Sequence, residues 1–410
     1  MLLSALVLGT AWAVRGKFGH EQGAAWAGGI GALGVLLAAR RSDWYSKVFK
    51  IMLASAFGWG IGGVISYGMV VGYARAQDLA NVYYSLVMLF VIGGLYGFIG
   101  GGFFGLALID SPEKKIKWSS LLAEMVAGGI LFYSFLIVEL EWFMTPPRSE
   151  MWAACAGAAV ALAWYIVRHR LTAVLRVAVW SAFGAGFGFA FGNFLQVLGS
   201  ALHIPFNFWN VMEYSIGFFG GGAMAYGTLT ATWPSTASPS RHVNGAALFL
   251  LFAFIPFVVW QQSFVSSRIA DVVGVNGDTF TIRVIAAVVI TLMACGVGWR
   301  YQVRQRDPLV HYSERGVGIL FLTYAGVFTF LSFLLTGLWV HPLEQYLYLA
   351  NLGVIFLIQP RLQGSVDSRE VRFSSWAIVL GYILILLALL ALVARYTHGE
   401  LPGAQTRFSL

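Results

Sequence analysis

The chain has 410 residues, of which 59% are hydrophobic and only 11% are charged. So few charges exclude a soluble globular protein of this size, because its surface could not be kept in water. The formal net charge of +8 does not indicate a nucleic-acid partner, since lysines and arginines of a membrane protein gather in its cytoplasmic connectors.

Long apolar segments separated by short polar connectors fill most of the chain. A helix needs about 20 apolar residues to cross a bilayer, and several segments reach that length without the alternation of barrel strands. We therefore predict an all-α, polytopic integral membrane protein with about 13 transmembrane helices. The predicted spans are roughly 1–14, 23–39, 51–73, 82–109, 117–143, 152–167, 173–200, 207–231, 244–262, 281–302, 316–338, 344–359 and 373–395.

Basic residues cluster in alternate connectors. Under the positive-inside rule these connectors are cytoplasmic, which predicts an N-terminus inside and a C-terminus outside. The short loops and the absence of extra domains favour a prokaryotic cytoplasmic membrane. The clusters are Arg40, Arg41, Lys47 and Lys50; Lys114, Lys115 and Lys117; Arg168, Arg170 and Arg176; Arg241; Arg300, Arg304 and Arg306; and Arg361, Arg369 and Arg372.

The connector between the first two spans breaks this pattern. Arg15, Lys17, His20, Glu21 and Gln22 follow one another there, interspersed with glycines. Such charges are unfavourable at membrane depth unless they are buried and paired. One interpretation is a solvated outer loop. The other is a break between two half-spans that lines a polar cavity, because irregular backbone at membrane depth is tolerated only there.

The first half of the chain contains an internal repeat. Residues 26–66 align without gaps onto 152–192, and a Ser-Ala-Phe-Gly block recurs at 55–58 and 181–184. Each copy holds an even number of spans, so both copies would have the same orientation, as in transporters built from parallel repeats. We predict three parts, namely a four-span repeat at 1–110, a second four-span repeat at 111–232 and a C-terminal five-span bundle at 233–410.

Glycines recur at helical spacing in these repeats. Gly93, Gly97 and Gly101 lie four residues apart and would form one glycine face. Small residues let membrane helices approach closely, so tight helix packing is the expected role. Opening a cavity for cargo is the alternative.

Further polar residues interrupt the apolar segments. The repeat offset places Glu141 opposite Arg15, and the connector after the seventh span is rich in histidine and asparagine. We add Glu141, Asn193, His203, Asn207 and Asn210 to the candidate substrate-binding residues of the first connector. Glu124 and Glu213 lie within predicted spans and are candidates for carrying a coupling proton, because burial raises the pKa of a carboxylate toward neutrality. A structural hydrogen-bonding role is the alternative for both.

The first functional hypothesis is a secondary transporter or permease for a small polar or anionic solute, bound between the two repeats and coupled to protons. The second is a membrane-embedded transferase for a lipid-linked or periplasmic substrate such as a sugar or lipid, with His20 as general base. The third is a non-catalytic subunit of a membrane complex. The partners implied are the lipid bilayer and a small-molecule or lipid-linked substrate, with further copies of the chain or other subunits left open. Walker-loop, zinc-protease and nucleophile-elbow motifs do not occur, and we expect no metal and no cofactor.

Overall fold

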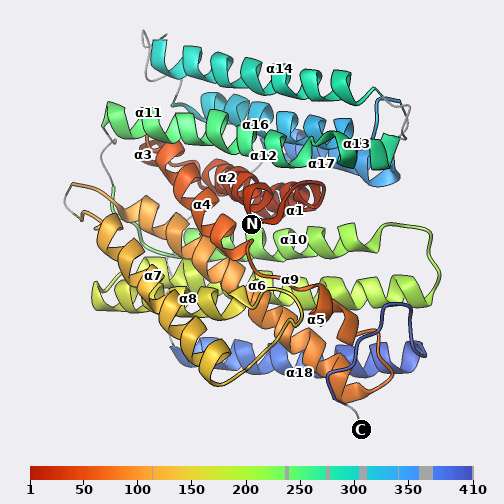
Figure 1. Cartoon of the computed structure of the whole chain (residues 1–410). Coiled ribbons are helices and arrows are strands. Elements are labelled where there is room, and N and C mark those ends of the chain that lie inside the picture. Colours follow the sequence, from red (N-terminus) through yellow and green to blue (C-terminus); the bar gives the residue numbers. More distant parts are fainter. Residues whose placement is uncertain are drawn as a thin grey trace.

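We describe a computed structural model of residues 1–112, 114–235, 240–273, 278–303, 312–339, 341–359 and 373–408. Within these ranges the chain forms helices and no strands (Figure 1). The helices of the first predicted repeat are α1 (Leu2–Arg15), α2 (His20–Ala39), α3 (Ser42–Tyr45), α4 (Val48–Gly62), α5 (Gly68–Tyr73) and α6 (Leu79–Ile109). Those of the second are α7 (Trp118–Tyr133), continued by the π-helical turn η1 (Ser134–Glu139), α8 (Met151–Arg168), α9 (Thr172–Ala201) and α10 (Phe208–Leu229).

The C-terminal part is also helical. Two of its apolar segments contain π-helical turns, and the last long helix is followed by a short tail. Its helices are α11 (Arg241–Phe249), η2 (Leu250–Phe254), α12 (Ile255–Ser263), α13 (Ser266–Val273), α14 (Thr279–Gly298), η3 (Trp299–Val303), α16 (Glu314–Leu334), α17 (Leu343–Ile358) and α18 (Phe373–Thr397).

Nine helices of the described part are long and apolar enough to cross a membrane. These are α2, α6, α7 with η1, α8, α9, the continuous α11–η2–α12, α14 with η3, α16 and α18; α1, α4 and α17 are shorter apolar helices. Only 17% of the most apolar window of α18 is buried inside the protein, as expected of a helix that faces lipid tails. The all-helical class and an integral membrane protein are thus confirmed.

One predicted span is interrupted. The segment expected at 51–73 forms α4 and α5, and the residues from Gly63 to Tyr67 between them are not helical. The hydroxyl of Tyr96 on α6 donates to the freed carbonyl of Ile65 at 3.3 Å. A neighbouring helix thus satisfies part of the broken backbone, which is the condition for a break at membrane depth.

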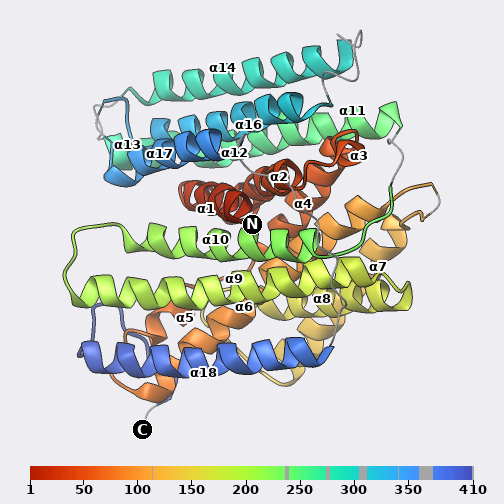
Figure 2. The same cartoon turned by 180° about the vertical axis from the view of Figure 1, so that it is seen from behind.

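The helices lie side by side as a stack of layers (Figures 1 and 2). α14 lies at one edge and α18 at the other, with α1, α2 and α4 between the C-terminal helices α11–α17 and the helices α9 and α10. α1 packs against α2, α10, α16 and α17, and α18 packs against α6 and α9. The start of the chain therefore forms the centre of the molecule.

Glycines set the closest helix contacts. Gly93, Gly97 and Gly101 all face α9, where a Cβ on Gly97 would collide with the carbonyl oxygen of Ser181. The predicted glycine face is therefore confirmed as a packing surface. Helices in lipid gain no hydrophobic free energy when they associate, so close backbone contact through small residues stabilises their packing instead.

The two copies of the Ser-Ala-Phe-Gly block make equivalent contacts. A Cβ on Gly58 of α4 would contact the carbonyl oxygen of Ile99 on α6, and one on Gly184 of α9 would contact that of Phe219 on α10. The gapless alignment of 26–66 onto 152–192 relates the two glycines, and a slightly shorter offset relates their partners. The duplication itself and the boundaries of its two repeats stay predictions.

Candidate functional site

Two breaks in the helices lie next to each other. α1 ends at Arg15 and α2 begins at His20, while α4 ends at Gly62 and α5 begins at Gly68. A Cβ on Gly63 would lie 2.6 Å from the carbonyl oxygen of His20, so only glycine allows the second break to approach the first this closely. The two irregular segments together line a polar cavity.

A buried ion pair forms the inner wall of this cavity. Nη1 of Arg15 lies 3.5 Å from Oε2 of Glu213 on α10, with side chains 2% and 7% exposed. The hydroxyl of Tyr67, in the second break, donates to Oε1 of Glu213 at 2.5 Å. The guanidinium of Arg15 also lies over the ring of Trp12, 4.8 Å from its centroid, and such a cation–π contact adds to the stabilisation of the charge.

Arg15 keeps unused hydrogen-bonding capacity. Its buried Nε and Nη2 have no acceptor in good hydrogen-bond geometry among the described residues, although the hydroxyl of Tyr96 lies close enough for a weak hydrogen bond to the guanidinium. An arginine carries five N–H donors in a planar fork that suits a carboxylate or phosphate. The fork is therefore only partly satisfied by Glu213.

A second polar cluster lies at the start of α10 and α17. Nζ of Lys17 lies 3.4 Å from Oε1 of Glu344, which also accepts a hydrogen bond from Nδ2 of Asn207 at 3.1 Å. Nδ2 of Asn210 donates to the carbonyl oxygen of Ala13 at 3.1 Å and to the hydroxyl of Tyr348. These bonds hold the C-terminal end of α1 and its following turn against α10 and α17.

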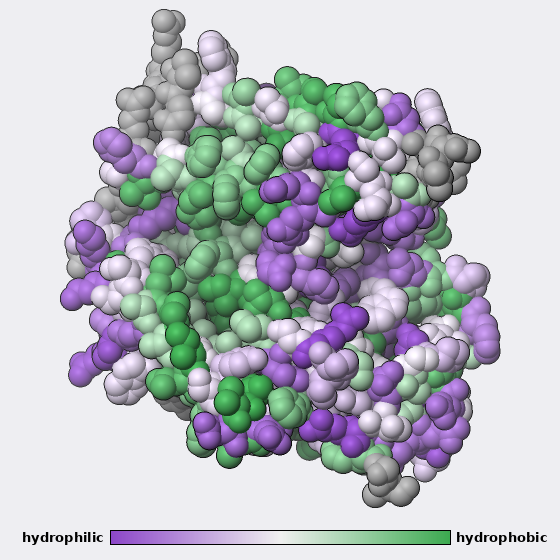
Figure 3. Space-filling view, viewed as in Figure 1, coloured by the Kyte–Doolittle hydropathy of each residue, from purple (hydrophilic) through white to green (hydrophobic). Residues whose placement is uncertain are grey.

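The cavity has a volume of about 460 Å³, within the range of small-molecule sites. Figure 3 shows hydrophilic residues around a hollow right of centre, at the level between α1 and α10 in Figure 1. Arg148, before α8, also lines the cavity and lies near enough to His20 to act on its charge. The lining residues are Arg15–Phe18, His20, Glu21, Val64–Gly68, Arg148, Asn207, Trp209, Asn210 and Glu213.

Most of the predicted site residues meet here. Those that line the cavity are Arg15, Lys17, His20, Glu21, Asn207, Asn210 and Glu213. Gln22 is buried beside Gly19 and Asn193 is buried on α9, where its Nδ2 donates to Oγ of Ser85 at 3.3 Å. The segment 15–22 thus has the cavity-lining geometry of the second interpretation.

Three predicted residues are placed away from the cavity. Glu141 and His203 are exposed and do not line it. Glu124 forms a partly exposed ion pair with Arg168 on α8, with 2.7 Å between Oε1 and Nη2. Arg15 therefore pairs with Glu213 and not with Glu141, the residue that the repeat offset suggested.

Several residues of the site were not singled out from the sequence. Tyr67 and Ser66 lie in a segment that is otherwise apolar, and Arg148 follows two prolines in a connector. Glu344 and Tyr348 belong to the C-terminal part. The internal repeat does not extend into that part, so it could not indicate their contacts. The one available signal was the acidic side chain of Glu344 at the start of an apolar segment, which is an unusual position in a membrane protein.

Within the described ranges, no three His, Cys, Asp or Glu residues are grouped so that they could hold a metal ion. The polar groups of the cavity instead suit direct binding of a small charged or hydrogen-bonding molecule. Searches against protein families, curated proteins and solved structures found no match to the chain.

Proposed function

We propose that the protein is a secondary transporter for a small anionic solute, which binds in the cavity between the predicted repeats and moves together with a proton. The observation that carries this proposal is the Arg15–Glu213 pair, because it joins a residue of repeat one to a residue of repeat two inside a polar cavity. Alternating access needs a binding site that both moving parts share.

Cations in the cavity define the solute class. Arg15, Lys17 and Arg148 all line it. Glu213 and Glu344 lie beside the first two, and no ion pair of Arg148 is found among the described residues. An anion such as a small carboxylate or phosphate would bind to Arg148 and to the free donors of Arg15.

Proton coupling follows from competition for Arg15. An anionic solute that reaches the guanidinium must share it with the carboxylate of Glu213, and two adjacent anions repel each other in a site of low dielectric constant. Protonation of Glu213 removes that repulsion, and the hydroxyl of Tyr67 can keep its hydrogen bond to the neutral acid. Solute and proton would therefore bind together, with Glu213 as the proton carrier because it is the cavity carboxylate paired with Arg15; Glu124 does not line the cavity.

The direction of the cavity follows from the predicted orientation. The turns at 16–19 and 63–67 and the connector at 202–207 carry few basic residues compared with the alternate connectors, so the cavity would open outward. The described structure then corresponds to an outward-facing state in a prokaryotic cytoplasmic membrane.

The proposal is tested with purified protein in proteoliposomes. A panel of labelled small carboxylates, phosphate and neutral polyols is offered with and without an inward proton gradient. We expect gradient-driven uptake of at least one anion by the wild type, and by Glu124→Gln as the matched control. Glu213→Gln should keep gradient-independent exchange of the same anion and lose its response to the gradient.

Three results would contradict the proposal. Uptake of no anion by folded wild-type protein would exclude anion transport, and an unchanged proton response in Glu213→Gln would exclude the assigned carrier. Preference for the neutral polyols would show that the cations hold the structure together and do not select the solute.

The transferase hypothesis keeps one specific observation in its favour. His20 lines the cavity beside Arg15 and Arg148, and its ring lies against that of Tyr67 at 5.5 Å between centroids. A histidine next to anion-binding cations could act as a general base. If His20→Ala abolishes formation of a lipid product by the purified protein while solute binding persists, the cavity is an active site.

A further inference from the structure

A second cavity lies at the opposite end of α4. The first cavity lies just beyond the C-terminal end of this helix, at 64–68, whereas the second is lined by its early residues from Lys50 to Phe57. The two cavities have no lining residue in common, so they are separate sites. The second has a volume of about 690 Å³.

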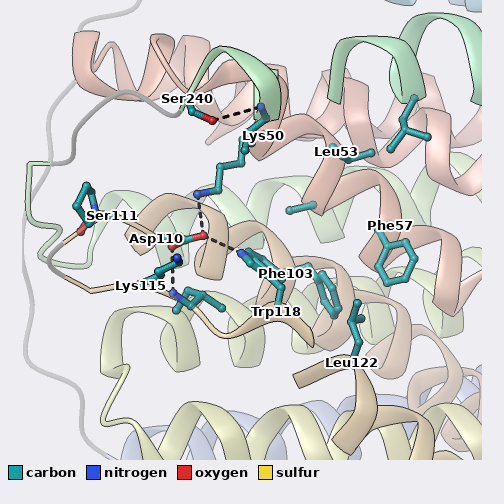
Figure 4. A pocket seen from close by; sticks show the side chains of 15 residues that line it. Lys50, Leu53, Phe57, Phe103, Asp110, Ser111, Lys115, Trp118, Leu122 and Ser240 are labelled. Carbon is teal, nitrogen blue, oxygen red and sulfur yellow. Dashed lines mark hydrogen bonds and ion pairs between the residues drawn. The ribbon is translucent and has the colours of Figure 1, made fainter. Parts of the chain in front are cut away.

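One end of this cavity is charged (Figure 4). Nζ of Lys50 lies 2.7 Å from Oδ2 of Asp110, which also accepts from Nε1 of Trp118, and Oδ1 accepts from the backbone N–H of Ile116. Three donors therefore bind the two carboxylate oxygens of Asp110. Lys115 lines the same end with an exposed side chain, and it stays available for an anion.

The other end of the cavity is apolar. Figure 4 shows Leu53, Phe57, Phe103 and Leu122 on the side away from the charged residues. Phe57 is 47% exposed although it belongs to an apolar helix. The ring of Phe57 is thus open to an apolar ligand on this side of the cavity.

We propose that this cavity binds a phospholipid of the bilayer with an anionic head group. Its phosphate would lie at Lys115 and Lys50, and one acyl chain would lie along Phe57, Phe103 and Leu122. The order of charged and apolar ends along the cavity matches the order of head group and tail in a lipid. A free phosphate would leave the apolar end empty, and an apolar peptide would not use Lys115.

The surroundings of the charged end support this assignment. Lys114, Lys115 and Lys117 are all exposed in the connector between α6 and α7, one of the basic connectors that are expected on the cytoplasmic side. Anionic lipids of that leaflet attract exposed basic residues near the surface. The cavity would add a tail-binding groove to this general attraction.

The test uses native mass spectrometry of the full-length protein in detergent. Phosphatidylglycerol is the probe, phosphatidylcholine is the zwitterionic comparison and glycerol phosphate is the head group without tails. Lys115→Gln removes the cavity lysine, and Lys114→Gln is the matched control because it removes an equal charge next to the cavity. Ala54→Phe fills the groove, with monodispersity and thermal unfolding measured to confirm folding.

We expect one phosphatidylglycerol to bind in preference to phosphatidylcholine. Lys115→Gln should weaken its affinity about fivefold, the equivalent of roughly 1 kcal/mol, while Lys114→Gln should leave it unchanged. Displacement of the lipid by glycerol phosphate would overturn the proposal in favour of a phosphate site. Equal binding of phosphatidylcholine would overturn it in favour of an apolar groove, and equal effects of both lysine variants would indicate diffuse surface attraction.

Failure of this site would leave the transport proposal intact. None of the residues changed here lines the cavity of Arg15 and Glu213. Solute uptake by Lys115→Gln in liposomes without anionic lipid therefore separates the two proposals.

Discussion

Arg15 and Glu213 form a buried ion pair between the end of α1 and the second turn of α10, with 3.5 Å between Nη1 and Oε2. The pair places the turn after α1 against α10 and so fixes one wall of the polar cavity. Desolvating two charges is unfavourable, and a buried pair is often no more stabilising than well-packed apolar residues. Its presence at the cavity therefore argues for a role in binding.

Removing one partner of this pair should destabilise the protein strongly. We expect Arg15→Gln and Glu213→Gln each to lower the free energy of unfolding by about 3–5 kcal/mol, because each leaves an uncompensated buried charge. The double variant should lose clearly less than the sum of both. Unfolding in mixed micelles followed by tryptophan fluorescence gives the three values, and strictly additive losses would show that the two side chains do not interact.

Tyr67 should contribute more to stability than another buried tyrosine hydroxyl. Tyr67→Phe removes a hydrogen bond to a carboxylate, with an expected loss of about 1.5–3 kcal/mol. Tyr324→Phe is the matched control, because its buried hydroxyl donates at 3.2 Å to the neutral carbonyl of Leu251 and should cost about 0.5–1.5 kcal/mol. The same unfolding assay compares them, and a larger loss for Tyr324→Phe would contradict the assigned bond to Glu213.

Hydropathy was sufficient to predict the all-helical class and the long apolar helices of the described part, because a bilayer requires long apolar segments whose backbone is satisfied internally. It also identified the segment 15–22, since clustered charges between two spans stand out against an apolar background. The break between α4 and α5 could not be found in this way. Residues 63–67 are largely apolar, and their freed backbone is satisfied by Tyr96 from another helix, a contact that sequence order does not reveal.

The sequence also did not show which charged residues form ion pairs with each other. Arg15 could have paired with any of several acidic residues, and the repeat offset pointed to Glu141. The pairing with Glu213 depends on α1 packing against α10, which follows from three-dimensional contacts between distant segments. Glu344 was missed for the same reason, because its partner Lys17 lies at the other end of the chain.

The glycine face of α6 provides a sharp test of the packing. A Cβ on Gly97 would collide with the carbonyl oxygen of Ser181, whereas one on Gly94 would lie 3.7 Å from that of Ala182. We expect Gly97→Ala to destabilise the protein by about 1–3 kcal/mol, because α9 must move away. Gly94→Ala should be neutral or slightly stabilising, since alanine is the better helix former. Equal unfolding midpoints for the two variants would mean that α6 and α9 are not in contact along this face.

Single cysteines can establish the side on which the polar cavity opens. The background variant replaces Cys155 and Cys295 by alanine, and cysteine is then introduced at Leu202 or at Lys114, both of which are exposed. If the orientation follows the positive-inside rule, a membrane-impermeant maleimide should label Leu202→Cys in intact cells and Lys114→Cys only after the membrane is opened.

Ser66→Cys extends this experiment into the cavity, because Ser66 lines it without being part of its ionic pairs. Labelling of Ser66→Cys from the same side as Leu202→Cys is expected for an outward-open cavity, and a bound anion should slow the reaction by occupying the space. Labelling only from the side of Lys114→Cys would reverse the assigned opening. Labelling from both sides in one population would instead be direct evidence of alternating access, since a single rigid cavity could not be reached from both.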